Sequence, residues 1–295
     1  MLHILQKTFP LFLFAWLLLV GLSGCGAYSG IAGVPPVTPR EFLQQQHWIK
    51  VEAGRLSFIW SQPSSTLIVY FVGLFTMYAG YTLLHHRNNQ QARLWWGIGL
   101  LLSGLGALLA GTSYQAFGYE IKCSGRESCT WTSWWEIVYL WLSVPAMNAF
   151  LVATAYTSAS GRLRNGIVRY AVLNTVGYSL LLLYSAACAF QFGLSFECMA
   201  LVSAPGVLFL LCLHGSGYAK HKDNRNRVLL NTWLIFMAVG IAYGVYLLSG
   251  FAATLWQHGI WFTENDVLHV GMIGWVYYLF NNTRQVVVDS EPAGS

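Results

Sequence analysis

The chain has 295 residues, of which 56% are hydrophobic and only 9% charged, and its formal net charge is +5. An ordinary soluble domain has about 25% charged residues, so this composition excludes a soluble globular protein and indicates an integral membrane protein. The basic residues lie mostly in short loops between apolar segments. The positive charge therefore gives no argument for nucleic acid as a partner.

The first 25 residues have the layout of a secretory signal peptide. They contain one lysine, Lys7, then a short apolar core, then small residues before Cys25. The tetrapeptide LSGC, which ends at Cys25, also resembles the bacterial lipobox, in which cleavage precedes a lipidated cysteine. The alternative is a chance match in an uncleaved first helix. In both cases we expect the segment 26–63 on the periplasmic side, with a short amphipathic piece at the membrane surface.

Seven further apolar windows follow, most of them close to the roughly 20 residues that a membrane-spanning helix needs. Backbone groups in lipid must be hydrogen-bonded within their own segment, so these windows are predicted to be helices. The expected fold is all-α, with a seven-transmembrane-helix bundle over residues 64–284 and a cytoplasmic tail over residues 285–295. The predicted spans are 64–84, 94–117, 134–156, 167–190, 193–214, 228–250 and 266–281.

The basic residues predict the orientation of this bundle. If residue 26 onward lies outside, the loops 85–93, 161–169 and 218–227 and the tail lie in the cytoplasm. These pieces carry Arg87, Arg93, Arg162, Arg164, Arg169, Lys220, Lys222, Arg225, Arg227 and Arg284. The positive-inside rule and the signal segment therefore agree. They predict a multi-pass protein of the bacterial inner membrane, with a periplasmic N-terminus and a cytoplasmic C-terminus.

One outer loop contains two cysteines that are close in sequence. It reads KCSGRESC and places Cys123 and Cys129 on the predicted periplasmic side. An oxidising compartment favours a disulfide between them. A pair of metal ligands is the alternative, but no other Cys or His lies in that loop.

Polar residues enter several spans at one depth. The apolar run LWWGIGLLLSGLGALL ends in AGTSYQAFGYEIKC, which contains Ser113, Tyr114 and Gln115. Other spans bring Glu136 and Glu197 to the same outer third of the membrane, and the last span begins FTENDVLHV. Ionisable residues inside spans usually face the bundle interior, a cavity or one another.

This depth predicts a pocket that opens to the periplasm. On the last span, Asn265 and His269 are four residues apart and share a helix face, and Asp266 is three residues from His269. The expected lining is Gln115, Glu136, Glu197, Asn265, Asp266 and His269. The alternative is that each polar group forms a private helix-to-helix hydrogen bond or caps a helix end, as Asp266 would in a first turn.

These residues resemble a known seven-helix pattern, that of the superfamily of alkaline ceramidases and adiponectin or progestin receptors. That pattern has a His near the end of the second helix, an acid early in the third and an HxxxH pair on the seventh. Here Gln115 stands at the first position, Glu136 at the second, and Asn265 and His269 at the HxxxH pair. The chain therefore has one of the three imidazoles.

The resemblance implies a metal-dependent hydrolase of membrane lipids or of a lipid-like small molecule. A zinc ion held by His269 and Asp266 would activate water, with Glu136 as the base and Ser113 and Tyr114 as oxyanion donors. Without metal, His269 paired to Asp266 could act as a general base instead. Zinc prefers His nitrogen, Cys sulfur and carboxylate oxygen, so a carboxylate-rich set would have to replace the missing imidazoles.

Two other functions stay open at this point. The same pocket could belong to a non-enzymatic seven-helix sensor or binding protein without metal, whose inner loops contact a protein partner. A membrane terpene cyclase is a third option, because the string WWEIVY resembles that group. The enzyme and the sensor differ in one observation. Either Glu136, Asp266 and His269 converge within metal-ligand distance, or each pairs privately with a neighbour.

Overall fold

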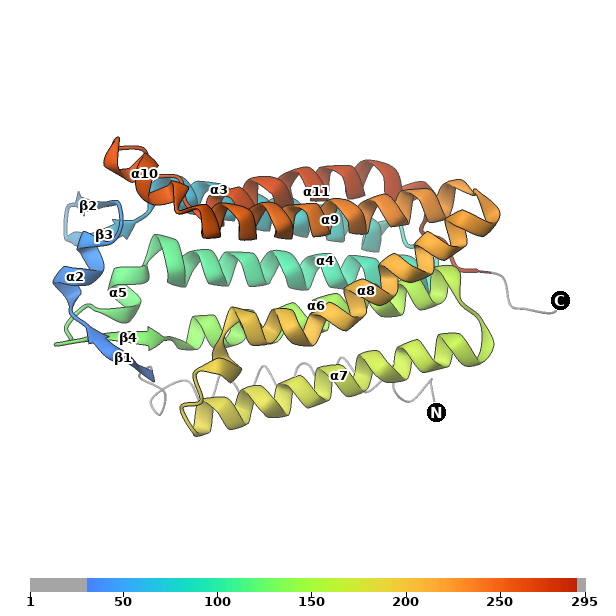
Figure 1. The fold of residues 1–295 in the computed structure, drawn as a ribbon, viewed down its shortest axis with the longest axis horizontal. Helices are drawn as coiled ribbons and strands as arrows, with labels where there is room; N and C mark the ends of the chain where they lie inside the picture. Colours follow the sequence, from blue (N-terminus) through green and yellow to red (C-terminus); the bar gives the residue numbers. More distant parts are fainter. Residues whose placement is uncertain (1–30, 291–295) are drawn as a thin grey trace.

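The structure is a computed structural model that describes residues 31–290. Long helices run side by side along one axis, and small elements gather at one end (Figure 1). The long helices are α3 (Pro63–His85), α4 (Gln91–Ala110), α6 (Trp134–Ser158), α7 (Gly161–Ala187), α8 (Phe196–His221), α9 (Asn224–Ser249) and α11 (Glu264–Val286). The small elements are β1 (Ile31–Val37), α2 (Pro39–Gln44), β2 (Trp48–Ala53), β3 (Leu56–Ser61), η1 (Gly111–Ala116), α5 (Gly118–Lys122), β4 (Cys129–Thr132), η2 (Phe192–Leu194) and α10 (Phe251–Gln257).

Six of the long helices are long and apolar enough to cross a membrane: α3, α4 with its continuation η1, α6, α7, α8 and α9. The chain is therefore a multi-pass membrane protein. The helix α11 has comparable length and lies against α3 and α9, but its ends are more polar. The lipobox and Cys25 lie outside the described residues.

The helices close a ring in the order α3, α4, α6, α8, α9 and α11, since each of these packs on the next and α11 packs back on α3. The helix α7 packs on the outside, against α6. As a result α6 has neighbours on most of its surface and is the most buried of the spans. This position explains why its sequence is apolar on every face rather than on one stripe.

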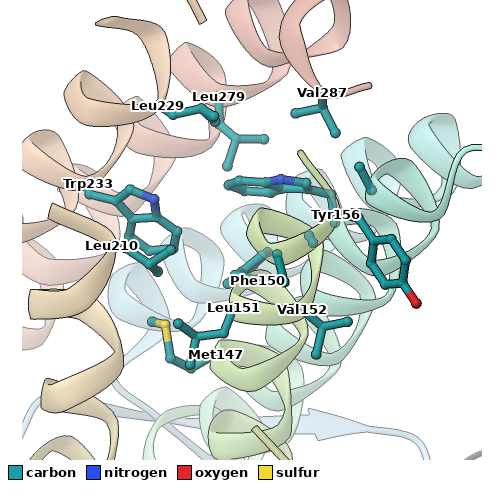
Figure 2. Close-up of a cluster of buried hydrophobic side chains, with 14 of the residues drawn as sticks. Met147, Phe150, Leu151, Val152, Tyr156, Leu210, Leu229, Trp233, Leu279 and Val287 are labelled. Atoms are coloured by element: carbon teal, nitrogen blue, oxygen red, sulfur yellow. The ribbon is translucent and has the colours of Figure 1, made fainter. Parts of the chain in front are cut away.

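Aromatic rings fill the core where these helices meet (Figure 2). The ring of Phe150 on α6 lies 4.9 Å from that of Trp96 and 5.8 Å from that of Trp233. The indole of Trp275 on α11 donates to the backbone carbonyl of Thr232 on α9 at 2.9 Å. Large rings in edge-to-face contact supply much of the packing energy of such a core.

Two pairs of glycines let α3 and α4 approach closely. A Cβ atom on Gly80 would lie 2.8 Å from the backbone oxygen of Gly97, and one on Gly104 would lie 2.6 Å from that of Gly73. Small residues at such contacts allow the van der Waals packing on which helix association in lipid depends. The second and first predicted spans are thus joined along most of their length.

The end of the bundle that carries the small elements is here called the capped end; it lies on the left of Figure 1. There β1 pairs with β4 and β2 pairs with β3, both antiparallel. The expectation of an all-α fold was therefore wrong for this region, since residues 31–61 contain three strands beside the short helix α2. The strands are short, and β1 pairs with a strand about a hundred residues away. A local sequence pattern therefore does not predict them.

At the opposite end the segment 287–290 is docked on the bundle. The helix α11 ends at Val286, and the carboxylate of Asp289 accepts hydrogen bonds from the backbone N–H groups of Gln91 and Ala92 at the start of α4. Arg164 donates to the hydroxyl of Ser290 at 2.8 Å. The predicted tail 285–295 therefore begins as helix and continues through residue 290 as a packed segment.

Candidate functional site

The second predicted span ends in one turn of π-helix, η1, which carries the polar residues of the opening motif. The hydroxyl of Ser113 is fully buried and Gln115 is 3% exposed, whereas the ring of Tyr114 is 40% exposed. Isolated π-turns inside α-helices are rare and are frequently found at functional sites. This turn directs Ser113 inward and leaves Tyr114 near the surface of the capped end.

Ser113 faces Glu136, which lies at the third position of α6. The Ser113 hydroxyl donates to Glu136 Oε1 at 2.8 Å, and the backbone N–H of Ser133 donates to Oε2 at 3.2 Å. The Ser133 hydroxyl lies 2.8 Å from that of Ser113 and also accepts from the first turn in a capping box. Glu136 is 1% exposed, so both of its oxygens are held in a closed network.

Lys122 neutralises this buried carboxylate. Its Nζ lies 2.7 Å from Glu136 Oε1, donates to the backbone carbonyl of Trp131 at 3.0 Å, and stands 4.9 Å above the ring of Tyr114. The next residue, Cys123, is joined to Cys129 by a disulfide, and β4 begins at that second cysteine. The predicted disulfide is thus present, and it closes the loop that brings the lysine to the carboxylate.

This arrangement differs from the predicted pocket. Glu136 was expected to stand free as a base, but Lys122, Ser113 and Ser133 bind its two carboxylate oxygens. Ser113 was expected as an oxyanion donor, but its proton is directed to Glu136. A buried ion pair whose remaining lone pairs are satisfied is stable as long as both partners stay in place. The network therefore acts as a closed structural joint between α5, η1 and α6.

Asp266 forms a second capping arrangement, at the start of α11. Its Oδ2 accepts from the backbone N–H of Thr263 at 2.6 Å and from the hydroxyl of the same residue at 3.1 Å. The alternative expectation, that Asp266 caps the last helix, is confirmed. The residue is 1% exposed, and its other oxygen, Oδ1, has no hydrogen-bond partner among residues 31–290. Asn265 and His269, both half-buried, lie one turn apart on the same helix.

Glu197 has a different surrounding. It is exposed in the first turn of α8 and lies within electrostatic reach of Tyr139 on α6 and Tyr243 on α9. Tyr243 in turn reaches Glu264, and Tyr246 reaches both Glu264 and Asp266. We call this set the tyrosine–carboxylate belt. It consists of Tyr139, Glu197, Tyr243, Tyr246, Glu264 and Asp266.

The belt contains two of the predicted pocket residues and four that sequence analysis missed. Its tyrosines sit at the capped end of spans, where tyrosine is common for reasons of membrane anchoring alone. The signal that could have found them was their spacing. Tyr243 and Tyr246 share one face of α9, and Tyr139 lies one turn beyond Glu136.

The predicted zinc ligands Asp266 and His269 lie one turn apart on α11 and within electrostatic reach of each other. Glu136, the predicted base, is bound in its own network on α6. Among residues 31–290 there is no group of three His, Cys, Asp or Glu side chains that could hold a metal ion. The donor set does not fit the zinc site that the resemblance implied, and we derive no step through a metal.

Comparison with known proteins places the chain in one family. The model of a family of unknown function, DUF6962, matches residues 64–287, so the chain belongs to that family. The match begins in the first turn of α3 and ends just after α11, and thus covers the whole helical bundle. No curated protein and no solved structure matches the chain.

Proposed function

We propose that this protein is a non-enzymatic ligand-binding sensor of the bacterial inner membrane, with seven spans and the capped end in the periplasm. The single observation that supports it best is the contrast between the carboxylates. Glu136, the base of the predicted zinc mechanism, is bound by Lys122, Ser113 and Ser133, whereas Glu197 and Glu264 lie within electrostatic reach of tyrosines and form no ion pair with a lysine or arginine of residues 31–290. This geometry is suited to holding a molecule rather than to activating water.

Two independent features support the proposed orientation. The loops from α3 to α4, α6 to α7 and α8 to α9 lie at the end opposite the cap (Figure 1), and these loops with the helix turns beside them carry most of the lysines and arginines of the chain. The positive-inside rule puts that end in the cytoplasm. The disulfide between Cys123 and Cys129 lies at the capped end, where an oxidising periplasm would maintain it. A signal segment, or a lipid on Cys25, fits the same direction.

The seventh span of the proposal is α11. It runs the length of the bundle between α3 and α9, and its charged residues lie at its two ends. Polar residues near helix ends reach the headgroup region at modest cost. Fusion of a fluorescent protein or of alkaline phosphatase to the C-terminus tests this topology. We expect fluorescence and no phosphatase activity, and the opposite pattern would exclude an odd number of spans after a periplasmic N-terminus.

The binding function is tested with the full chain in a maltoside detergent. The protein is incubated with an extract of bacterial membranes and periplasm, and native mass spectrometry records any bound molecule. We expect a ligand that is recovered with unchanged mass and that is lost in a Glu197→Gln, Tyr243→Leu double variant. Glu52→Gln, in the exposed hairpin of β2 and β3, is the matched control and should retain the ligand.

The hydrolase function predicts different results from the same protein. It expects stoichiometric zinc in the purified protein, loss of that zinc in His269→Ala, and conversion of ceramide-like or acyl-amide lipids that Glu136→Gln abolishes. Metal analysis beside the mass spectrometry therefore separates the two functions. Zinc together with lipid products would overturn the sensor proposal.

A further inference from the structure

The connection from α9 to α11, residues 250–263, contains the short helix α10 and no charged residue. Counting back into α9, the sequence has no Asp, Glu, Lys or Arg from residue 228 onward. The hairpin of β2 and β3, at the same end of the molecule, carries Lys50, Glu52 and Arg55. Charged residues are common on surfaces that face water, so the composition of this connection indicates a different environment.

The two neighbouring helices set the depth of this connection in the membrane. A span needs about 20 residues, so one that begins after Arg227 in the first turn of α9 reaches the opposite boundary near Leu247. The next long helix, α11, begins at Glu264 and packs beside α9. The connection therefore starts and ends at the same boundary of the bilayer, and α10 lies at the level of the lipid headgroups.

Large apolar side chains on this connection point away from the protein. Leu248 is 88% exposed, Phe251 is 49% exposed, Trp256 is 39% exposed and Ile260 is 53% exposed. No residue of α10 is buried. Exposed apolar groups that gather in one place mark an interaction surface, either with a protein or with a membrane.

This apolar surface continues along α9. Ile241 and Val245 are exposed, and together with Leu248 they lie on one face of the helix at spacings of four and three residues. Because α9 is a membrane span, its exposed apolar face contacts lipid. Figure 1 shows α10 at the outer edge of the capped end, just beyond the end of α9. The apolar surface of α10 is therefore continuous with a surface that faces lipid.

Contacts on its inner side hold α10 in this orientation. The ring of Trp256 lies 5.1 Å from that of Trp261 and 6.0 Å from that of His47, with its neighbours edge-on in both pairs. The indole of Trp261 donates in turn to the hydroxyl of Ser65, at the start of α3, at 3.0 Å. The connection is thus packed on the protein at one side while its other side stays open and apolar.

We propose that residues 248–262 bind the surface of the lipid bilayer at the capped end, with Leu248, Phe251, Trp256 and Ile260 inserted beside the upper acyl chains. Aromatic rings at the end of a span are favoured in the interface, and a helix with an apolar face lies in its plane. Since the segment has no cation, its partner is the apolar part of the lipid and not an anionic headgroup. The inference concerns residues outside the tyrosine–carboxylate belt and does not rest on the sensor function.

The test is photocrosslinking of the full chain in phospholipid vesicles. The photoreactive residue p-benzoylphenylalanine replaces Phe251 or Trp256 in separate variants, and mass spectrometry measures the yield of phospholipid adducts after irradiation. Ile241 on α9 is the positive control, and the exposed Glu52 of the hairpin is the control in water. We expect position 251 or 256 to give about tenfold more adduct than position 52. Phe251 is the more conservative replacement, and it keeps the test decisive if the Trp256 variant does not fold.

Lipid charge sharpens this test. Vesicles of phosphatidylcholine alone are compared with vesicles that also contain phosphatidylglycerol. Because residues 228–263 have no charged side chain, the adduct yields in the two kinds of vesicle should agree within about twofold. A yield that rises about tenfold with phosphatidylglycerol overturns the proposal, because electrostatic attraction would then control the contact.

The remaining outcomes are also decisive. Phospholipid adducts at position 251 or 256, with position 241 labelled and position 52 unlabelled, support the proposal. Absence of adducts at 251 and 256 while 241 is labelled overturns it, and so do equal yields at 52 and 256. Crosslinks from 251 or 256 to a second copy of the chain or to a copurified protein, without lipid adducts, overturn it as well and identify the surface as a protein interface.

Discussion

Glu136 and Glu197 occupy nearly the same place in two different spans, but their exposure and their partners differ. Each lies in the first turn of a long helix at the capped end. Glu136 is 1% exposed and is surrounded by Lys122, Ser113 and Ser133. Glu197 is exposed, lies within electrostatic reach of Tyr139 and Tyr243, and forms no ion pair with a lysine or arginine among the described residues.

The difference comes from what the chain brings to each carboxylate. A loop closed by a disulfide delivers Lys122 to Glu136, and a neighbouring π-turn delivers Ser113. No such loop reaches Glu197, because the connection before α8 is the short turn η2 and carries no basic residue. The first carboxylate therefore contributes to the stability of the bundle, and the second is the carboxylate to which the proposed sensor function assigns a ligand.

The largest effect is expected when the closed network loses its cation. Lys122→Met leaves Glu136 buried without a counter-charge, which costs about 3–5 kcal/mol of the free energy of unfolding. The double variant Lys122→Met, Glu136→Gln removes both charges and should recover most of that loss. Thermal unfolding in detergent measures both. Lys50→Met, which breaks the exposed pair with Glu52, is the control and should leave the melting temperature unchanged.

If Lys122→Met were as stable as the wild type, the carboxylate would have another route to neutralisation and the network would not be closed. Failure of the double variant to recover would instead show that the lysine stem or the capping box, rather than the charge pair, supplies the stability.

A smaller effect is expected when the loop that carries the lysine is opened. Replacing Cys123 and Cys129 by serine removes the constraint that the disulfide places on the unfolded chain, which for so short a loop is worth about 2 kcal/mol. The same loss should appear in wild-type protein unfolded under reducing conditions. If reduction destabilises the serine variant as well, the effect comes from the reagent and not from this bond.

The spans could be predicted from the sequence, but the partners of their polar residues could not. Apolar windows mark helices because lipid requires internal backbone hydrogen bonds, and the second predicted span, 94–117, agrees closely with α4 and η1 together. The depth of Ser113, Gln115, Glu136 and Asp266 follows from the same windows. Which of them touch depends on the ring order of the helices, and no periodicity within a single span contains that order.

The capped end shows this limit most clearly. In the sequence Lys122 is one basic residue of an outer loop, and its role as the partner of Glu136 depends on the turn of α5 and on the pairing of β1 with β4. The docked segment 287–290 is similar, because Asp289 reaches the start of α4 from almost two hundred residues away. Contacts of such separation are fixed by tertiary packing, which local propensity does not encode.

Loss of a single hydrogen bond to Glu136 should have a moderate effect. Ser113→Ala removes one donor from a buried carboxylate and should cost about 1–3 kcal/mol, as judged from the melting temperature. Ser103→Ala on α4 is the matched control, because that hydroxyl only returns to the backbone carbonyl of Gly99. An equal loss in both variants would mean that the Ser113 donor matters no more than an intrahelical one.

The smallest effect on stability is expected at the other carboxylate. Glu197→Gln changes a charge that has no ion-pair partner among the described residues, so the melting temperature without ligand should shift by no more than about 1 °C. In the presence of the ligand that the sensor function requires, the wild type should gain stability by mass action and the variant should not. A large loss of stability in the ligand-free variant would show that Glu197, like Glu136, belongs to the scaffold, and the division of labour between the two carboxylates would then be wrong.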